Sequence, residues 1–140
     1  MISQRNAQAA NDAIAFLRLV HPEGPWSLVA VSPGGQIEGQ TFDPADVEEV
    51  RRYIAERNGQ SNLYFSIGVV RGRLTKKARK EDLKALRYLQ IDIDLDVDWS
   101  DAVAVEAARA DALERLHEYH PTPTLIVFAA ASYRWARLEG

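Results

Sequence analysis

The chain has 140 residues and a mass of 15.7 kDa, the size of one ordinary domain, so we expect a single domain over residues 1–140. Its 46% hydrophobic and 26% charged residues are typical of a soluble globular protein and not of a disordered or fibrous one. The lack of cysteine excludes disulfides, thiolate zinc sites and a cysteine nucleophile. No apolar run approaches the roughly 20 residues that span a bilayer. The N-terminus has no signal-peptide core either, so we expect a cytoplasmic protein without a membrane partner.

The net charge of −3 is distributed unevenly along the chain. Residues 71–87 contain eight basic and two acidic side chains, which gives this stretch a local charge of +6. Residues 92–106 then contain six acidic side chains and no basic one. A cationic stretch next to an anionic one suggests a phosphate-binding loop beside a cation-binding segment, although solvated surface charge would give the same pattern.

The first half of the chain shows clear helix and strand signals. Helical spacing of apolar residues predicts a helix over residues 10–20 that ends at the prolines after it. Residues 26–31 and 36–42 predict a β-hairpin across a Pro-Gly-Gly turn. Asp43 and Pro44 are typical of a helix start, and Asn58-Gly59 of its end. Residues 62–70 are rich in β-formers and predict a central strand.

The second half predicts a short helix around residues 81–86 and an alternating strand over residues 88–95. A further helix is expected to start at Asp101 or a neighbour and to end before Pro121. A last hairpin is expected from residues 124–128 and 133–138. This order predicts an α+β fold, an α/β sandwich in which helices pack on one mixed β-sheet.

Asp92 and Asp94 are the main candidate metal ligands. In the predicted strand they project from the same face about 7 Å apart, and two neighbouring carboxylates repel each other unless a cation lies between them. Carboxylate oxygens suit Mg²⁺ or Mn²⁺, and such ions serve phosphoryl and nucleotidyl transfer. A solvated acidic strand end remains the alternative, and Asp96 and Asp98 are weaker candidates because they approach the strand end.

Several segments share an ordered series of motifs with one family. They are NLYF at 62–65, RGRLTKK at 71–77, KEDL at 80–83, LQIDID at 89–94, and PTPTLIVF at 121–128 with Tyr133 and 137–139. Together they resemble the N-terminal part of archaeo-eukaryotic primase-polymerases of the phage and plasmid type. The resemblance covers residues 62–138 and, more loosely, the first 60.

The resemblance implies that Asp92 and Asp94 are catalytic and hold Mg²⁺ or Mn²⁺ for nucleotidyl transfer. It also implies a DNA template, nucleotides and a replicative helicase as partners. Half of an active-site cleft would leave apolar sheet uncovered, so a homodimer is a further expectation. The candidate phosphate contacts are basic side chains: Arg71, Arg73, Lys76, Lys77, Arg79 and Arg134.

Two departures from the family pattern keep other functions open. Residues 129–131 are alanines where the family has Ser and a glycine-rich turn, so Ser132 and Arg134 are the nearest replacements. The third motif, with another metal-binding acid, has no counterpart, so the chain is expected to be incomplete relative to the family's catalytic module. The alternatives are a non-catalytic nucleic-acid-binding or interaction module derived from a primase, and another metal-dependent phosphoryl-transfer enzyme such as a nuclease.

Two other groups of side chains are weaker candidates. Tyr64 and Phe65 are adjacent in a predicted strand, so one of them must face the core and at most one can stack on a base. His117 and His120 lie one helical turn apart without a third ligand, which favours ordinary surface residues over a metal site.

Overall fold

The computed structural model describes residues 4–90, 93–121, 123 and 126. The chain divides into two compact units, and the first contains the described residues 4–89. The second contains residue 90 and the described residues after it. The structure describes only residue 126 of the hairpin predicted for residues 124–128 and 133–138. Asp92 and Arg134 also lie outside the described residues.

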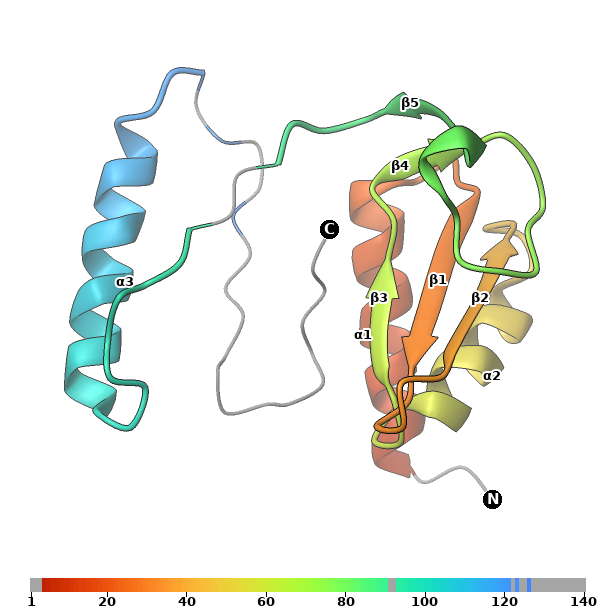
Figure 1. Cartoon of the computed structure of the whole chain (residues 1–140), viewed down its shortest axis with the longest axis horizontal. Coiled ribbons are helices and arrows are strands. Elements are labelled where there is room, and N and C mark those ends of the chain that lie inside the picture. The colour runs from red at the N-terminus through yellow and green to blue at the C-terminus, as the bar shows by residue number, and fades with distance from the viewer. Residues whose placement is uncertain (1–3, 91–92, 122, 124–125, 127–140) are drawn as a thin grey trace. The chain divides into compact units, whose positions relative to one another are not determined.

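The first unit is a small α+β structure (Figure 1). Its three-stranded sheet has the order β2-β1-β3 with antiparallel pairing, and β4 and β5 form a separate antiparallel pair. The elements are α1 (Gln4–Val20), β1 (Trp26–Val31), β2 (Ile37–Phe42), α2 (Val47–Arg57), β3 (Asn62–Phe65), β4 (Gly68–Val70), the 3₁₀ turn η1 (Lys80–Asp82) and β5 (Leu83–Leu86).

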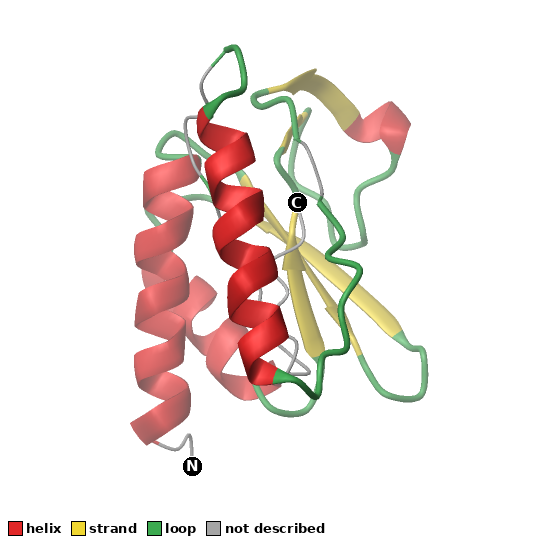
Figure 2. Cartoon of the chain, turned by 90° about the vertical axis from the view of Figure 1, so that its left-hand side faces the viewer, coloured by secondary structure: helices red, strands yellow, loops and turns green. Residues whose placement is uncertain are grey.

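The core of this unit lies between the sheet and the two helices. Figure 2 shows α1 and α2 against the same face of the three-stranded sheet. Leu28 of β1 pairs with Phe65 of β3, and both are buried on this face. The ring of Phe16 from α1 meets that of Phe65 edge to face at 5.6 Å, and α2 contributes Val50. Because side chains alternate along a strand, the intervening residues of β1 and β2 point to the opposite face.

Helix α2 begins later than its sequence signal indicates. The prediction that Asp43 caps the helix and Pro44 starts it was wrong, because Asp46 is the N-cap and Val47 the first helical residue. Asp43 instead accepts a hydrogen bond from the backbone of Ala45 at 2.8 Å, which forms a turn before the helix. The helix ends at Arg57 with Asn58 as C-cap, as predicted, and Gly59 follows with a positive φ of 84°.

The predicted central strand over residues 62–70 is interrupted, and its two halves lie in different sheets. The backbone of Ser66 still bonds to Ser27 of β1, but its hydroxyl oxygen accepts from the backbone of Gly68 at 3.1 Å. This local bond turns the chain out of the sheet, so β4 pairs with β5 instead. Gly68 leaves room for Leu83 of β5, since a Cβ at this position would lie within 2.9 Å of the Leu83 methyl groups, which would have to shift.

Two further predictions for this region were wrong. Of the short helix predicted around residues 81–86, only residues 81 and 82 are helical, in η1, whereas residues 83–86 form β5 because pairing with β4 overrides their helix propensity. The described residues of the predicted strand 88–95, namely 88–90 and 93–95, have no strand conformation. Alternating polarity alone was therefore insufficient to predict a strand here, since a strand also needs a neighbouring strand with which to form hydrogen bonds.

The described part of the second unit consists of a loop followed by α3 (Ala102–His117). The helix starts where the sequence predicts, since the carboxylate of Asp101 accepts hydrogen bonds from the backbone of Val103 and Ala104, both at 3.0 Å. Its buried residues are Val105 and Ala112. The α+β class is thus confirmed, whereas the strand pairs of the described residues are antiparallel and do not form the expected mixed sheet.

Candidate nucleic-acid interface

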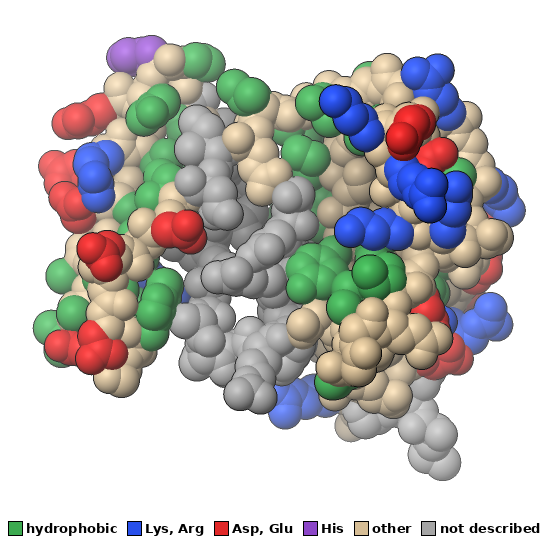
Figure 3. Space-filling view, in the orientation of Figure 1, with side chains coloured by type: hydrophobic (Ala, Val, Ile, Leu, Met, Phe, Trp, Pro, Cys, Tyr) green, Lys and Arg blue, Asp and Glu red, His purple; other side chains and the backbone are tan. Residues whose placement is uncertain are grey.

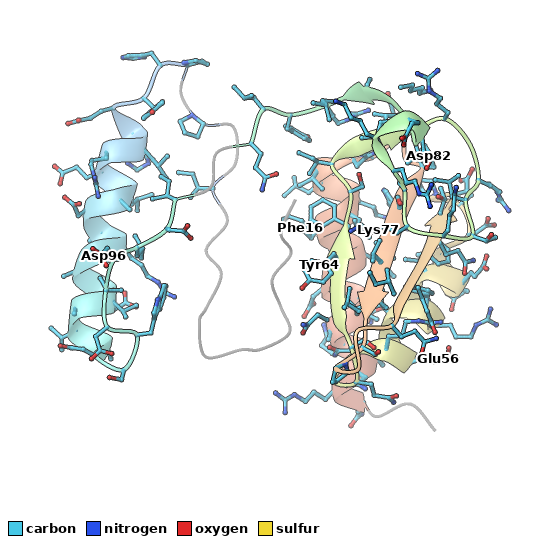
Figure 4. All side chains as sticks on the ribbon, viewed as in Figure 1. Phe16, Glu56, Tyr64, Lys77, Asp82 and Asp96 are labelled. Atoms are coloured by element: carbon cyan, nitrogen blue, oxygen red, sulfur yellow. The ribbon has the colours of Figure 1, made fainter. Side chains whose placement is uncertain are left out.

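The basic loop, residues 71–79, connects β4 to η1 and is attached at several points. The backbone N–H of Thr41 donates to the carbonyl of Leu74 at 2.9 Å, which fastens the middle of the loop to the outer edge of β2. The backbone N–H of Arg71 donates to the carbonyl of Asp82 at 2.8 Å, which joins the two ends of the loop. Figure 4 labels Lys77 and Asp82 in this part of the first unit. Backbone hydrogen bonds therefore fix this positively charged loop at its middle and at its ends.

Close packing against β2 also fixes the loop. A Cβ built on Gly39 would overlap the backbone of Lys76 and Lys77. Only a glycine allows the loop backbone to approach the strand this closely. Gly39 therefore belongs to the site, although it has no side chain with which to contact a ligand.

Arg71 and Arg73, two of the predicted phosphate contacts, interact mainly with the protein itself. The Nε of Arg71 donates to the carbonyl of Leu83 at 3.2 Å. The guanidinium of Arg73 pairs with the carboxylate of Asp46 at 2.9 Å, which joins the loop to the first turn of α2. Both side chains are exposed, but each has a structural partner and acts as an anchor of the loop.

Lys76, Lys77 and Arg79 differ from these two arginines. All three are exposed, and none has an ion-pair partner within the described part of the chain. Figure 3 shows that Lys and Arg side chains gather on this part of the first unit. Uncompensated cations on an anchored loop can interact with phosphate groups without first breaking internal ion pairs.

These three residues line a groove of about 770 Å³. One side is formed by residues 37–40 of β2, another by Tyr53 and Arg57 near the end of α2, and the third by residues 75–79 of the basic loop. We call this feature the β2 groove. Its volume falls within the range of about 300–1,000 Å³ that is usual for small-molecule sites.

Tyr53, Arg57 and Glu38 form a connected group in the β2 groove. The guanidinium of Arg57 lies over the Tyr53 ring, 3.9 Å from its centroid. Its Nε and one terminal nitrogen donate to the same oxygen of Glu38 at 3.1 and 2.9 Å. Burial raises the pKa of the Tyr53 hydroxyl, and the nearby positive charge of Arg57 partly opposes this effect. Tyr53 therefore stays neutral at physiological pH and serves as an apolar support for Arg57.

The acidic segment lies in the second unit. Asp94 is exposed and outside any strand, and Asp92 lies outside the described residues. Hydrogen bonds from Ser100 lower the pKa of Asp98, whose carboxylate thus closes a turn, while Asp101 caps α3. Within the described parts of the chain, no group of three or more His, Asp or Glu side chains is arranged as a metal site. The geometry of Asp92 with Asp94 is therefore left as a prediction.

The weaker candidates are placed as follows. Phe65 is buried in the core and Tyr64 is half-buried on the opposite face, which confirms that only one of them can meet a ligand. His117 and His120 are exposed at and after the end of α3.

Sequence reasoning missed Arg57 and Gly39. The glycine inside an otherwise regular strand was a usable signal of close backbone approach, whereas nothing in the sequence singled out Arg57.

We compared the chain with protein-family models, with curated proteins and with solved structures, and none of them matches. The helices of the described residues are all too short or too polar to cross a membrane.

Proposed function

We propose that this protein is a primase-polymerase-like module that binds nucleic acid through the basic loop, with Lys76, Lys77 and Arg79 as its phosphate contacts. The observation that carries the proposal is the difference within the loop: two arginines contact other parts of the protein, and three cations have no ion-pair partner among the described residues. In this proposal Arg71 and Arg73 position the loop and do not provide the main contacts.

The catalytic part of the proposal assigns Mg²⁺ or Mn²⁺ to Asp92 and Asp94. Asp94 presents an exposed carboxylate, the donor chemistry that these hard cations prefer. The bound ions would lower the barrier for attack of a 3′-hydroxyl on a nucleotide α-phosphate by stabilising the charge that develops there. A DNA template, nucleotides and a replicative helicase are the corresponding partners.

The binding proposal is tested by the salt dependence of affinity for a labelled single-stranded oligonucleotide. Each phosphate contact on a single strand contributes about 0.7 to the slope of log K against log salt. The triple variant Lys76→Gln, Lys77→Gln, Arg79→Gln is expected to bind more weakly and to reduce that slope by about 2. A matched control with the same charge change, Arg5→Gln, Arg18→Gln, Lys84→Gln, alters exposed cations outside the β2 groove. Equal losses in both variants would contradict the assignment and indicate only a general effect of net charge.

The catalytic proposal is tested by incubating the protein with a single-stranded template, labelled nucleotides and Mg²⁺ or Mn²⁺. Metal-dependent extension would support nucleotidyl transfer. Degradation of the template would favour the nuclease alternative, and binding without either reaction would favour the non-catalytic module. The variant Asp92→Asn, Asp94→Asn is the control for activity that does not come from these residues.

A further inference from the structure

We infer that the β2 groove binds one nucleoside phosphate, with the base stacked on the Arg57 guanidinium and the phosphates held by Lys76, Lys77 and Arg79. The inference rests on the proposed function in one respect, since the same three cations bind phosphate in both. It adds a base-binding surface that the basic loop alone does not provide.

The main observation is how completely Arg57 is held. Besides its two bonds to Glu38, its other terminal nitrogen donates to the carbonyl of Tyr53 at 3.4 Å and lies 3.7 Å from the carboxylate of Glu56. The central carbon of the guanidinium, Cζ, lies over the Tyr53 ring. Its donors are thus largely engaged within the protein, which makes Arg57 a poor phosphate ligand.

The remaining feature of Arg57 is its second flat face. The side chain is 27% exposed and lines the β2 groove, so part of it is accessible to a ligand there. A guanidinium plane stacks well on a nucleobase, and here the plane is held in advance by Tyr53 and Glu38. Preorganisation of this kind reduces the entropy cost of binding.

The charge distribution around the β2 groove suits the two ends of a nucleotide. Glu38 neutralises Arg57, so that side of the groove carries little net charge and can accept a base. The three cations without an ion-pair partner among the described residues come from a different element, the basic loop, and can bind the phosphates. A free nucleotide and the 5′-terminal nucleotide of a strand share this chemistry.

The experiment compares dATP with inorganic tripolyphosphate, which has the phosphates but no base, by calorimetry on the full chain. EDTA is present, so that metal-dependent binding at Asp92 and Asp94 does not contribute. Base stacking is expected to make dATP bind at least about fivefold more tightly than tripolyphosphate. Equal affinities would overturn the inference, and this comparison needs no variant.

The variant Arg57→Lys retains the positive charge beside Glu38 but removes the flat surface. It is expected to reduce the affinity for dATP to that for tripolyphosphate and to leave tripolyphosphate binding unchanged. The matched control Arg52→Lys makes the same substitution at an exposed arginine of α2 outside the β2 groove and is expected to change neither affinity. Equal weakening of both ligands in Arg57→Lys would overturn the stacking role.

The two sources of the ligand are separated with oligonucleotides that carry a 5′-phosphate or a 5′-hydroxyl. Tighter binding of the phosphorylated strand, lost in Arg57→Lys, identifies a strand terminus, whereas Arg57-dependent binding of dATP alone identifies a free nucleotide. If neither ligand depends on Arg57, the inference fails, while strand binding through the basic loop is still measured by the salt-dependence experiment above.

Discussion

Gly39 of β2 and Lys77 of the basic loop are packed backbone to backbone, with no room for a side chain between them. The substitution Gly39→Ala should therefore push the loop away from β2 while leaving its charge unchanged. We expect a stability loss of about 1–3 kcal/mol from overpacking. We also expect weaker binding of single-stranded DNA, because Lys76 and Lys77 move together with the loop. Thermal melting and anisotropy titration measure the two effects.

The control for this substitution lies in the same loop. A Cβ on Gly72 meets no atom within 4 Å, and Gly72 has no positive φ, so Gly72→Ala should change neither stability nor DNA affinity appreciably. If Gly39→Ala binds DNA as well as the wild type does, the position of the loop is irrelevant to binding and only its charge matters.

The metal assignment leads to a prediction that does not depend on catalysis. Two carboxylates that repel each other are stabilised by a bound divalent ion, and ligands that bind the folded state raise its melting temperature. Mg²⁺ or Mn²⁺ should therefore raise the melting temperature of the wild type, and the double variant Asp92→Asn, Asp94→Asn should abolish the rise. A rise of the same size in the double variant would exclude these residues as the metal ligands.

Sequence patterns predict the elements whose partners are close in the chain. The β1–β2 hairpin and the start of α3 at Asp101 follow from local turn and capping signals. The prediction fails where a distant partner decides the outcome. Residues 62–70 have strand propensity throughout, yet the Ser66–Gly68 bond and the competing partner β5 divide them between two sheets. Propensity reports on conformation and contains no information about which strands pair.

The same distinction applies to the candidate site. Counting charges in the sequence locates the basic loop. It cannot distinguish Arg73, which pairs with Asp46, from Lys76, which has no ion-pair partner among the described residues. Arg57 lies 14 residues before Arg71, the first residue of the loop, and its role depends on how α2 packs beside β2. A groove formed by three elements is a property of the fold, so only the structure could reveal it.

His21 gives the first unit a predictable response to acid. Its side chain is 2% exposed, and its two ring nitrogens have no hydrogen-bond partner among the described residues. Burial, aided by the positive charge of Arg87, lowers the pKa of His21 below its ordinary value of 6.5, while the negative charge of Glu23 acts in the opposite direction. Below about pH 6.5 the unfolded chain therefore binds a proton that the folded protein does not.

The sign of the effect follows from this difference in protonation. The free energy of unfolding should be independent of His21 above about pH 6.5 and should decrease as the pH falls from 6.5 towards the lower pKa of the folded state. Urea unfolding at pH 7.5 and 5.5 measures the decrease, which His21→Phe should reduce. His117→Gln, at an exposed histidine, should retain it. A decrease of equal size in His21→Phe would assign the acid response to other groups.

The cap of α3 provides a test in the second unit. The carboxylate of Asp101 satisfies the backbone N–H groups of Val103 and Ala104, and Asp101→Ala leaves both without this acceptor. We expect a loss of about 1 kcal/mol, and Asp101→Asn should recover most of it because its amide oxygen accepts the same bonds. Amide hydrogen exchange of residues 102–117 measures the effect, with β1 as an internal reference. Faster exchange in α3 alone supports a local capping role, whereas equal acceleration in β1 would mean that Asp101 stabilises more of the protein than its own helix.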